Sequence, residues 1–265
     1  MGHPMSRDGH VLTDHVGTST LVVTLNRTSN RNALSADMVD ALHDVLDEAE
    51  RSGVRVLILR SAAGTFSSGF GLDGLESETD ASLLMRFARI GILLERLSVI
   101  SCVTVAVVEG PAIGAGADVA LACDHRVGTS AARFRFPGAG FGVVLGSERL
   151  SELLGSARAL NLATGAASLD ATESAGLGLM TLSPQDELAD RVTELGRGFD
   201  DLDLPTLAAL KAAGRRRDMG EGLADLIRSI AGRPGLKNRL TDYVSSSRRG
   251  EYRPFVAAHT TTQNS

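Results

Sequence analysis

Short apolar runs and longer periodic segments alternate along most of the chain. Three of the runs are rich in β-branched residues: TLVVTL (20–25), GVRVLILR (53–60) and VTVAVVE (103–109). Runs of this length and composition predict strands, and the last two, apolar on both faces, are typical of a buried parallel sheet. Two shorter segments, DHRVGT (124–129) and RFRF (133–136), are predicted to be further strands.

Between these strands, apolar residues recur at helical spacing. Ser35 is placed to cap a helix, because a serine side chain can accept a hydrogen bond from the first helical turn. The apolar positions of that helix are Met38, Ala41, Leu42, Val45 and Leu46. The same periodicity predicts helices over about 80–98, 147–166 and 170–177.

This order of elements predicts an α/β fold, with a parallel sheet and helices packed outside it. We assign residues 1–200 to this core. Residues 201–265 show no strand pattern. We expect a helical module there, with a break near Pro205, that packs on the core or on a neighbouring subunit and serves oligomerisation.

Composition and charge exclude several classes of function. The chain has 265 residues and a formal net charge of −5, without a long basic run, so nucleic-acid binding is not expected. No apolar run has the length of a membrane span, and the N-terminus lacks the apolar region of a signal peptide. We therefore expect a cytoplasmic protein without membrane contact. Cys102 and Cys123 are expected to be buried free thiols, and the scattered histidines predict no metal site.

Two glycine-rich turns, FSSGFG (66–71) and AIGAGAD (112–118), each follow a predicted buried strand. Small residues let a ligand approach the main chain, and N–H groups at a helix start lack intrahelical partners. Two such groups, one from each turn, could converge on one oxygen and form an oxyanion hole. The alternative is that the glycines only permit tight packing.

Two other interpretations of these turns are disfavoured by the surrounding sequence. GAGADVA loosely imitates a dinucleotide-binding fingerprint, but it lies in the third βα unit, lacks the third glycine and has no acid about twenty residues later. A serine hydrolase is disfavoured because the chain contains no G-x-S-x-G motif.

Three motifs together resemble the crotonase superfamily, the enoyl-CoA hydratases and isomerases. They are LNRTSNRNALS (25–35), AGTFSSGFGLDGL (63–75) and VEGPAIGAGADVALACDHRV (108–127). The resemblance extends over about residues 10–255. It implies a spiral of repeated ββα units with a C-terminal helical module, assembled as a homotrimer or a dimer of trimers. It also implies an acyl-CoA thioester as substrate, no other cofactor, and a role as a lyase or isomerase in fatty-acid or related acyl-CoA metabolism.

The resemblance assigns site residues position by position. The backbone N–H groups of Phe70 and Ala115 align with the donors to the thioester oxygen. Phe70 stands where the family usually has alanine and is expected to narrow the acyl pocket. The residues expected along the substrate and CoA channel are Asn32, Ala33, Ser68, Phe70, Gly71, Leu72, Asp73 and Gly114.

The acidic positions depart from the family pattern. Asp118 aligns with the first glutamate of the hydratases, whereas Gly138 occupies the position of the second. A third acidic position, used by some members, falls near Gly146. Glu148 is the nearest substitute, although an acid at a helix start is more often simply solvated. Asp118 is itself favoured there by the helix dipole, which would stabilise its charged form.

The absence of the second acid limits the reactions that the site could catalyse. Hydration needs one group to activate water and another to supply a proton, whereas one carboxylate can shuttle a proton in an isomerase or assist a decarboxylation or retro-aldol step. We therefore expect weak or absent hydration of crotonyl-CoA. A CoA-ester binding protein that has lost catalysis is the alternative. Basic residues that could meet CoA phosphates are Arg31, Lys237, Arg239, Arg248 and Arg249.

Overall fold

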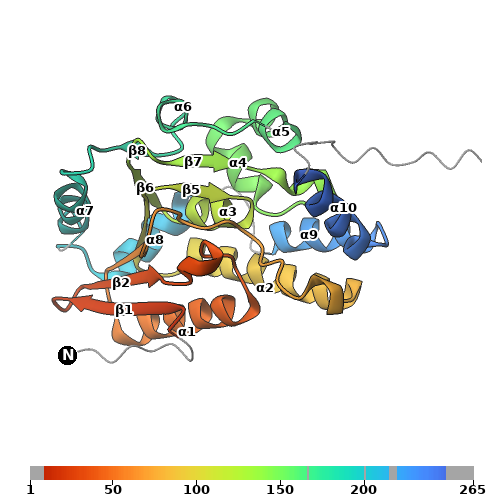
Figure 1. The fold of residues 1–265 in the computed structure, drawn as a ribbon. Helices are drawn as coiled ribbons and strands as arrows, with labels where there is room; N and C mark the ends of the chain where they lie inside the picture. Colours follow the sequence, from red (N-terminus) through yellow and green to blue (C-terminus); the bar gives the residue numbers. More distant parts are fainter. Residues whose placement is uncertain (1–8, 166, 200, 215–219, 249–265) are drawn as a thin grey trace, which may run out of the picture.

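The computed structural model describes residues 9–165, 167–199, 201–214 and 220–248. Its main sheet has the strand order β1-β2-β3-β4-β6-β8 (Figure 1). The strands are β1 (Val11–Val16), β2 (Thr20–Leu25), β3 (Val56–Ser61), β4 (Val103–Val108), β6 (His125–Gly128) and β8 (Thr181–Leu182). All neighbours pair in parallel except the β1–β2 hairpin, so the predicted α/β class and parallel sheet are confirmed.

A second, two-stranded sheet pairs β5 (Pro111–Ile113) with β7 (Arg133–Arg135) in parallel. The RFRF strand was predicted, but β5 was not, because three residues that begin with proline carry no periodic signal. Strands β1 and β8 were missed as well. The predicted strand over 53–60 starts late, because Gly53 adopts a left-handed conformation and ends the preceding helix.

The predicted helix after Ser35 and the one predicted over about 80–98 are confirmed as α1 (Ala36–Ser52) and α2 (Asp80–Val99). The Ser35 side chain accepts a hydrogen bond from the Met38 N–H at 3.3 Å, as the cap prediction requires. Thr79 caps α2 through a capping box with Ser82. The apolar faces of both helices enter the main core, where Met38 and Ile90 are completely or almost completely buried.

Shorter helices follow in the second half of the chain. They are α3 (Ala115–Ala122), α4 (Ser147–Leu154), α5 (Ser156–Thr164), α6 (Ala171–Gly176), α7 (Leu188–Arg197), α8 (Leu204–Gly214), α9 (Glu221–Ala231) and α10 (Leu236–Arg248). The single helix expected over 147–166 is divided in two at Gly155, whose φ of 78° does not continue a helix. Pro205 lies in the first turn of α8, where its missing N–H breaks no helical bond.

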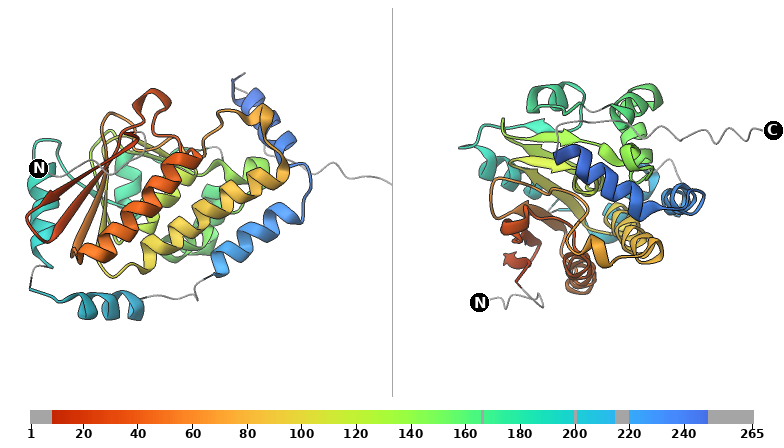
Figure 2. Two further views of the ribbon diagram at one scale, coloured as in Figure 1. Left: turned by 90° about the horizontal axis from the view of Figure 1, so that it is seen from below. Right: turned by 45° about the vertical axis from the view of Figure 1, so that its right-hand side comes forward.

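The C-terminal helices pack on the core of the same chain. Helices α1, α2 and α9 lie side by side in Figure 2. Leu226 of α9 and Leu240 of α10 share a buried cluster with Leu83 and Phe87 of α2. Assembly into trimers through this region stays a prediction. No helix in the described part of the chain is long and apolar enough to cross a membrane.

Candidate active site

Backbone hydrogen bonds join the two glycine-rich turns. The Ser67 N–H donates to the Pro111 carbonyl at 3.2 Å, and the Ile113 N–H donates to the Ser67 carbonyl at 2.9 Å. A Cβ atom on Gly116 would lie only 2.6 Å from the Ser67 Cβ. The glycine at position 116 is therefore what lets the start of α3 pack directly against the first turn.

The amides of Phe70 and Ala115 come close together in this arrangement. The turn around Phe70 is held by Leu34, whose N–H donates to the Gly69 carbonyl at 2.7 Å and whose carbonyl accepts the Gly71 N–H at 3.0 Å. A Cβ on Gly69 would lie 3.4 Å from the Ala115 nitrogen. Among the described hydrogen bonds, neither the Phe70 nor the Ala115 N–H has an acceptor within the protein.

A cavity of about 570 Å³ lies beside these two amides. Of the residues predicted for the site, those that line it are Ser68, Phe70, Leu72, Gly114, Ala115, Asp118 and Gly138. Other parts of its wall come from α4, α5 and α10. The described lining is predominantly apolar, and Asp118 supplies its only carboxylate. A volume of this size is typical of a small-molecule site.

Four residues predicted for the channel lie outside the described lining of the cavity: Asn32, Ala33, Gly71 and Asp73. Asn32 is 1% exposed. Its side-chain amide donates to the Thr65 carbonyl at 2.9 Å, and its backbone carbonyl accepts a hydrogen bond from the Ser67 hydroxyl at 2.7 Å. Asn32 thus supports the first turn from behind. Asp73 lies at the surface, paired with Arg27 at 2.7 Å.

Asp118 lies in the first turn of α3 and is 5% exposed. Burial raises the pKa of its carboxyl well above the ordinary value, the negative charge of Glu148 raises it further, and Arg149 lowers it. The expectation that the helix start would favour the charged form was wrong. Burial dominates, because removing a carboxylate from water disfavours its ionised form.

Gly138 lines the cavity but leaves no room for a side chain. A Cβ at this position would lie 2.7 Å from the Val143 carbonyl oxygen, because the Val143 N–H donates to the Gly138 carbonyl and closes the loop. The second family acid therefore could not be accommodated here without a change in the loop. Gly146, near the third acidic position, packs against Asp118 itself.

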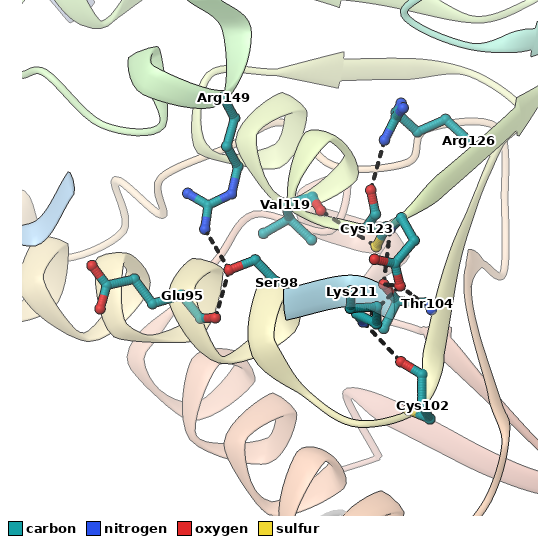
Figure 3. A network of polar contacts seen from close by, with 10 residues as sticks. Glu95, Ser98, Cys102, Thr104, Val119, Cys123, Arg126, Arg149 and Lys211 are labelled. Atoms are coloured by element: carbon teal, nitrogen blue, oxygen red, sulfur yellow. Dashed lines mark hydrogen bonds and ion pairs between the residues drawn. The ribbon is translucent and has the colours of Figure 1, made fainter. Parts of the chain in front are cut away.

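Glu148 is not the solvated residue that the sequence suggested. Its side chain is 12% exposed and forms an ion pair with Arg149 at 2.6 Å. Arg149 also donates to the Leu94 carbonyl at 3.0 Å. Its bond to the Ser98 hydroxyl, at 2.8 Å, is drawn in Figure 3. Glu148 is absent from the described cavity lining, so it influences Asp118 through its charge rather than by touching a ligand.

The basic residues considered for CoA phosphates are differently placed. Arg239 is 5% exposed and donates to the carbonyls of Phe141 and Pro234 at 2.9 and 2.7 Å, so it fixes a loop instead. The Lys237 amine donates to the Glu76 carbonyl at 2.7 Å. Arg249 and the side chain of Arg248 lie outside the described residues.

An aromatic row along the cavity was not anticipated. The ring centroids of Phe70 and Phe87 are 4.0 Å apart and stacked, those of Phe87 and Phe141 are 6.4 Å apart, and those of Phe141 and Tyr243 are 5.1 Å apart. All four side chains belong to residues that line the cavity. These residues are distant in sequence, so no local sequence pattern predicts that their rings lie in contact.

Comparison with known proteins identifies the family. A sequence profile of the enoyl-CoA hydratase/isomerase family matches residues 16–219. The chain belongs to the enoyl-CoA hydratase/isomerase family. It is 30% identical over 188 residues to a "Probable enoyl-CoA hydratase" of Bacillus subtilis (strain 168), a match that covers 68% of this chain and 72% of that protein.

Members of the family with another named activity are equally similar. The chain is 33% identical over 166 residues to human ethylmalonyl-CoA decarboxylase, covering 60% of this chain and 53% of the decarboxylase. The chain therefore matches little more than half the length of that relative. Family membership alone leaves both hydration and decarboxylation open.

Solved structures of family members share the fold. A Bordetella parapertussis protein described as an enoyl-CoA hydratase/isomerase superposes with a TM-score of 0.85 at 34% identity, covering 89% of this chain and 98% of that one. A Thermobifida fusca YX protein described as an enoyl-CoA hydratase, in complex with acetoacetyl-CoA, gives a TM-score of 0.70 at 27% identity, covering 88% and 95%. The crotonase fold predicted from the sequence is thus confirmed.

Proposed function

We propose that this protein converts an acyl-CoA thioester through an enolate, using Asp118 as its single acid–base group, and that its reaction is decarboxylation of an α-carboxylated acyl-CoA. The observation that carries the proposal is the cavity lining, in which Asp118 is the only described carboxylate and has a raised pKa. The proposed reaction uses the CoA thioester and needs no other cofactor.

The two unpaired amides support the binding of a thioester oxygen. Preorganised N–H donors stabilise an oxygen most when it becomes negatively charged, as it does in an enolate. The Phe70 and Ala115 N–H groups lie close together beside the cavity and have no acceptor among the described residues. Their proposed role is an oxyanion hole.

The position and protonation of Asp118 suit proton delivery to the enolate carbon. Ala115 and Asp118 both lie in the first turn of α3 and both line the cavity, so the proposed donor amide and the carboxyl belong to the same part of its wall. A raised pKa keeps the carboxyl protonated to a higher pH than an ordinary aspartate. A neutral acid beside an enolate can donate a proton without first acquiring one.

The proposed reaction has two steps. The bond between Cα and the substrate carboxylate breaks, carbon dioxide leaves, and the bonding electrons form the thioester enolate. The protonated Asp118 then donates its proton to Cα, giving the acyl-CoA product, and the resulting carboxylate regains a proton from solvent. Loss of carbon dioxide needs no base, so one acid is sufficient. The similarity to ethylmalonyl-CoA decarboxylase supports this choice.

Hydration is the less favoured candidate because it requires a second acid–base group. Gly138 has no space for one, and Glu148 is committed to Arg149 outside the described lining. Hydration of crotonyl-CoA is expected to be weak or absent.

The test is a side-by-side assay of three substrates: ethylmalonyl-CoA for decarboxylation, a 3-enoyl-CoA for isomerisation and crotonyl-CoA for hydration. In D₂O, decarboxylation should place one deuterium at Cα, measured by mass spectrometry. Asp118→Asn should lower the decarboxylation rate by roughly 10²–10⁴-fold. Asp44→Asn, on an exposed position of α1, is the control and should retain full activity.

Each other outcome has a definite meaning. Hydration faster than decarboxylation would overturn the proposal and require an acid that the described lining lacks. Isomerisation without decarboxylation would support the enolate mechanism and the role of Asp118, but it would show that decarboxylation is the wrong reaction. Binding of acyl-CoA without any turnover would identify a CoA-ester binding protein.

A further inference from the structure

The Phe70 ring is held between two side chains of α2. The Phe87 ring stacks on it with planes 10° apart and centroids at 4.0 Å. The guanidinium carbon of Arg86 lies 4.4 Å from the Phe70 ring centroid. A guanidinium over an aromatic ring is attracted by the electrons of its face, so both neighbours restrict the ring.

The same guanidinium is fixed by two further bonds. Arg86 donates to the carbonyl oxygen of Gly71 at 2.6 Å and pairs with the Glu78 carboxylate at 2.6 Å. The side chains of Arg86 and Glu78 are only 15% and 17% exposed. A hydrogen bond from the Ser82 hydroxyl and the contact with Arg86 lower the pKa of Glu78, which keeps this partner charged.

Arg86 therefore contacts the turn at two consecutive residues. It touches the side chain of Phe70 and the backbone carbonyl of Gly71, while Leu34 holds the Gly71 N–H and the Gly69 carbonyl. The alanine that the family usually has at position 70 would offer no ring for such a contact. The phenylalanine thus couples α2 to the donor turn.

We propose that Arg86 is a positioning residue that fixes the Phe70 N–H in the direction of the cavity. This inference rests on the proposed function, because the amide matters for catalysis only if it binds the thioester oxygen. Displacement of a catalytic group by a fraction of its contact distance lowers the rate of the chemical step while substrate binding is largely retained.

The test replaces Arg86 with lysine. Lysine keeps the positive charge and can pair with Glu78, but it lacks the planar group that stacks on Phe70 while also donating to Gly71. Arg89→Lys is the matched control. Arg89 lies on the same helix close to Arg86, and its described ion pair is with the exposed Asp40.

Two readouts are measured on both variants. For Arg86→Lys, kcat for the best thioester substrate should fall by about 10- to 100-fold while KM changes little. Hydrogen exchange of the Leu34 and Gly71 amides should become roughly 3- to 10-fold faster, the change expected when one hydrogen bond is lost. Arg89→Lys should match wild type in both.

The readouts separate this inference from the proposed function. If wild type turns over thioesters and Arg86→Lys has wild-type kcat and exchange, the positioning role is wrong and the proposed function stands. A rise in KM with unchanged kcat would equally overturn it, since that pattern indicates lost binding. If wild type shows no turnover, the proposed function fails. In that case, faster hydrogen exchange in Arg86→Lys would still support the conclusion that Arg86 fixes the turn around Phe70. Unchanged exchange would refute that conclusion.

Discussion

The backbone of Gly146 lies directly against the Asp118 carboxyl group. A Cβ atom at position 146 would lie 2.5 Å from the Asp118 Oδ1, and the φ angle of Gly146 is +65°. Two independent features therefore require glycine: a conformation that other residues rarely adopt and the absence of space beside the carboxyl. This contact also covers Asp118 and contributes to the burial that raises its pKa.

Replacing Gly146 with alanine should strongly lower the activity without unfolding the protein. The added methyl group must displace the Asp118 carboxyl, so we expect the rate to fall by roughly 10²-fold, as for a misplaced catalytic group. The backbone cost is about 1–2 kcal/mol. Gly17→Ala is the control, because Gly17 has a φ of +64° and nothing within 4 Å of the added atom. Equal activity losses in both variants would show that strain alone is responsible.

Asp118→Asn should make the protein more stable at high pH relative to wild type. The folded-state pKa of Asp118 lies above the ordinary value of 3.8, so between these two pH values the folded protein binds more protons than the unfolded chain. Wild-type stability attributable to this group therefore falls as pH rises through that window, by about 1.4 kcal/mol per unit of pKa shift. Asparagine cannot ionise and avoids this loss.

Urea denaturation at pH values from 4 to 8 measures this effect. The free energy of unfolding of Asp118→Asn, relative to wild type, should rise as pH increases from 4 and should stop rising once the pH exceeds the folded-state pKa of Asp118. A difference that stays constant with pH would contradict the raised pKa. Asp44→Asn, with its exposed side chain, serves as control.

Glu148→Gln should shift the pH dependence of turnover. The Glu148 charge raises the pKa of Asp118 and Arg149 lowers it, so neutralising Glu148 should lower the Asp118 pKa. Since protonated Asp118 is the active form in the proposed mechanism, the decline of kcat at high pH should begin at a lower pH than in wild type. Glu152→Gln, on the exposed side of α4, should leave the profile unchanged. An identical profile for Glu148→Gln would refute the electrostatic coupling.

Lys211→Met should destabilise the protein without altering chemistry in the cavity. The Lys211 amine donates to the Cys102 carbonyl at 2.8 Å and pairs with Asp124 at 2.7 Å, joining α8 to the sheet (Figure 3). Without the amine, the mostly buried Asp124 carboxylate keeps only the described hydrogen bonds from the Thr104 N–H and hydroxyl. We expect a loss of about 2 kcal/mol, because the Asp124 side chain retains some solvent contact. A double-mutant cycle with Asp124→Asn measures the coupling; a value near zero would contradict it.

The sequence predicted those parts of the molecule that local patterns determine. Buried strands such as β4, the Ser35 cap and the two glycine turns follow from hydrophobic spacing and the conformational freedom of glycine. The burial of Cys102 and Cys123 was also predicted, and it raises the pKa of each thiol to about 12, which leaves both inert.

Features that depend on distant contacts could not be predicted. The environment of Asp118 is set by Gly146 and Glu148, which reach it only through the fold, so the helix-start argument gave the wrong direction for its pKa. The stack of Arg86 on Phe70 likewise joins α2 to a separate turn. Neither residue carries a local signal for the contact.

The part of the cavity wall formed by Leu240 and Tyr243 is synthesised after the other parts of the site. These residues belong to α10, at the end of the described chain, whereas Ser68 and Phe70 are made early in synthesis. Because a ribosome adds residues from the N-terminus onward, the sheet and its turns can form before the wall exists. Until α10 emerges, Phe141 lacks its Tyr243 neighbour. A nascent or truncated chain can therefore carry every proposed catalytic group and still not enclose a substrate.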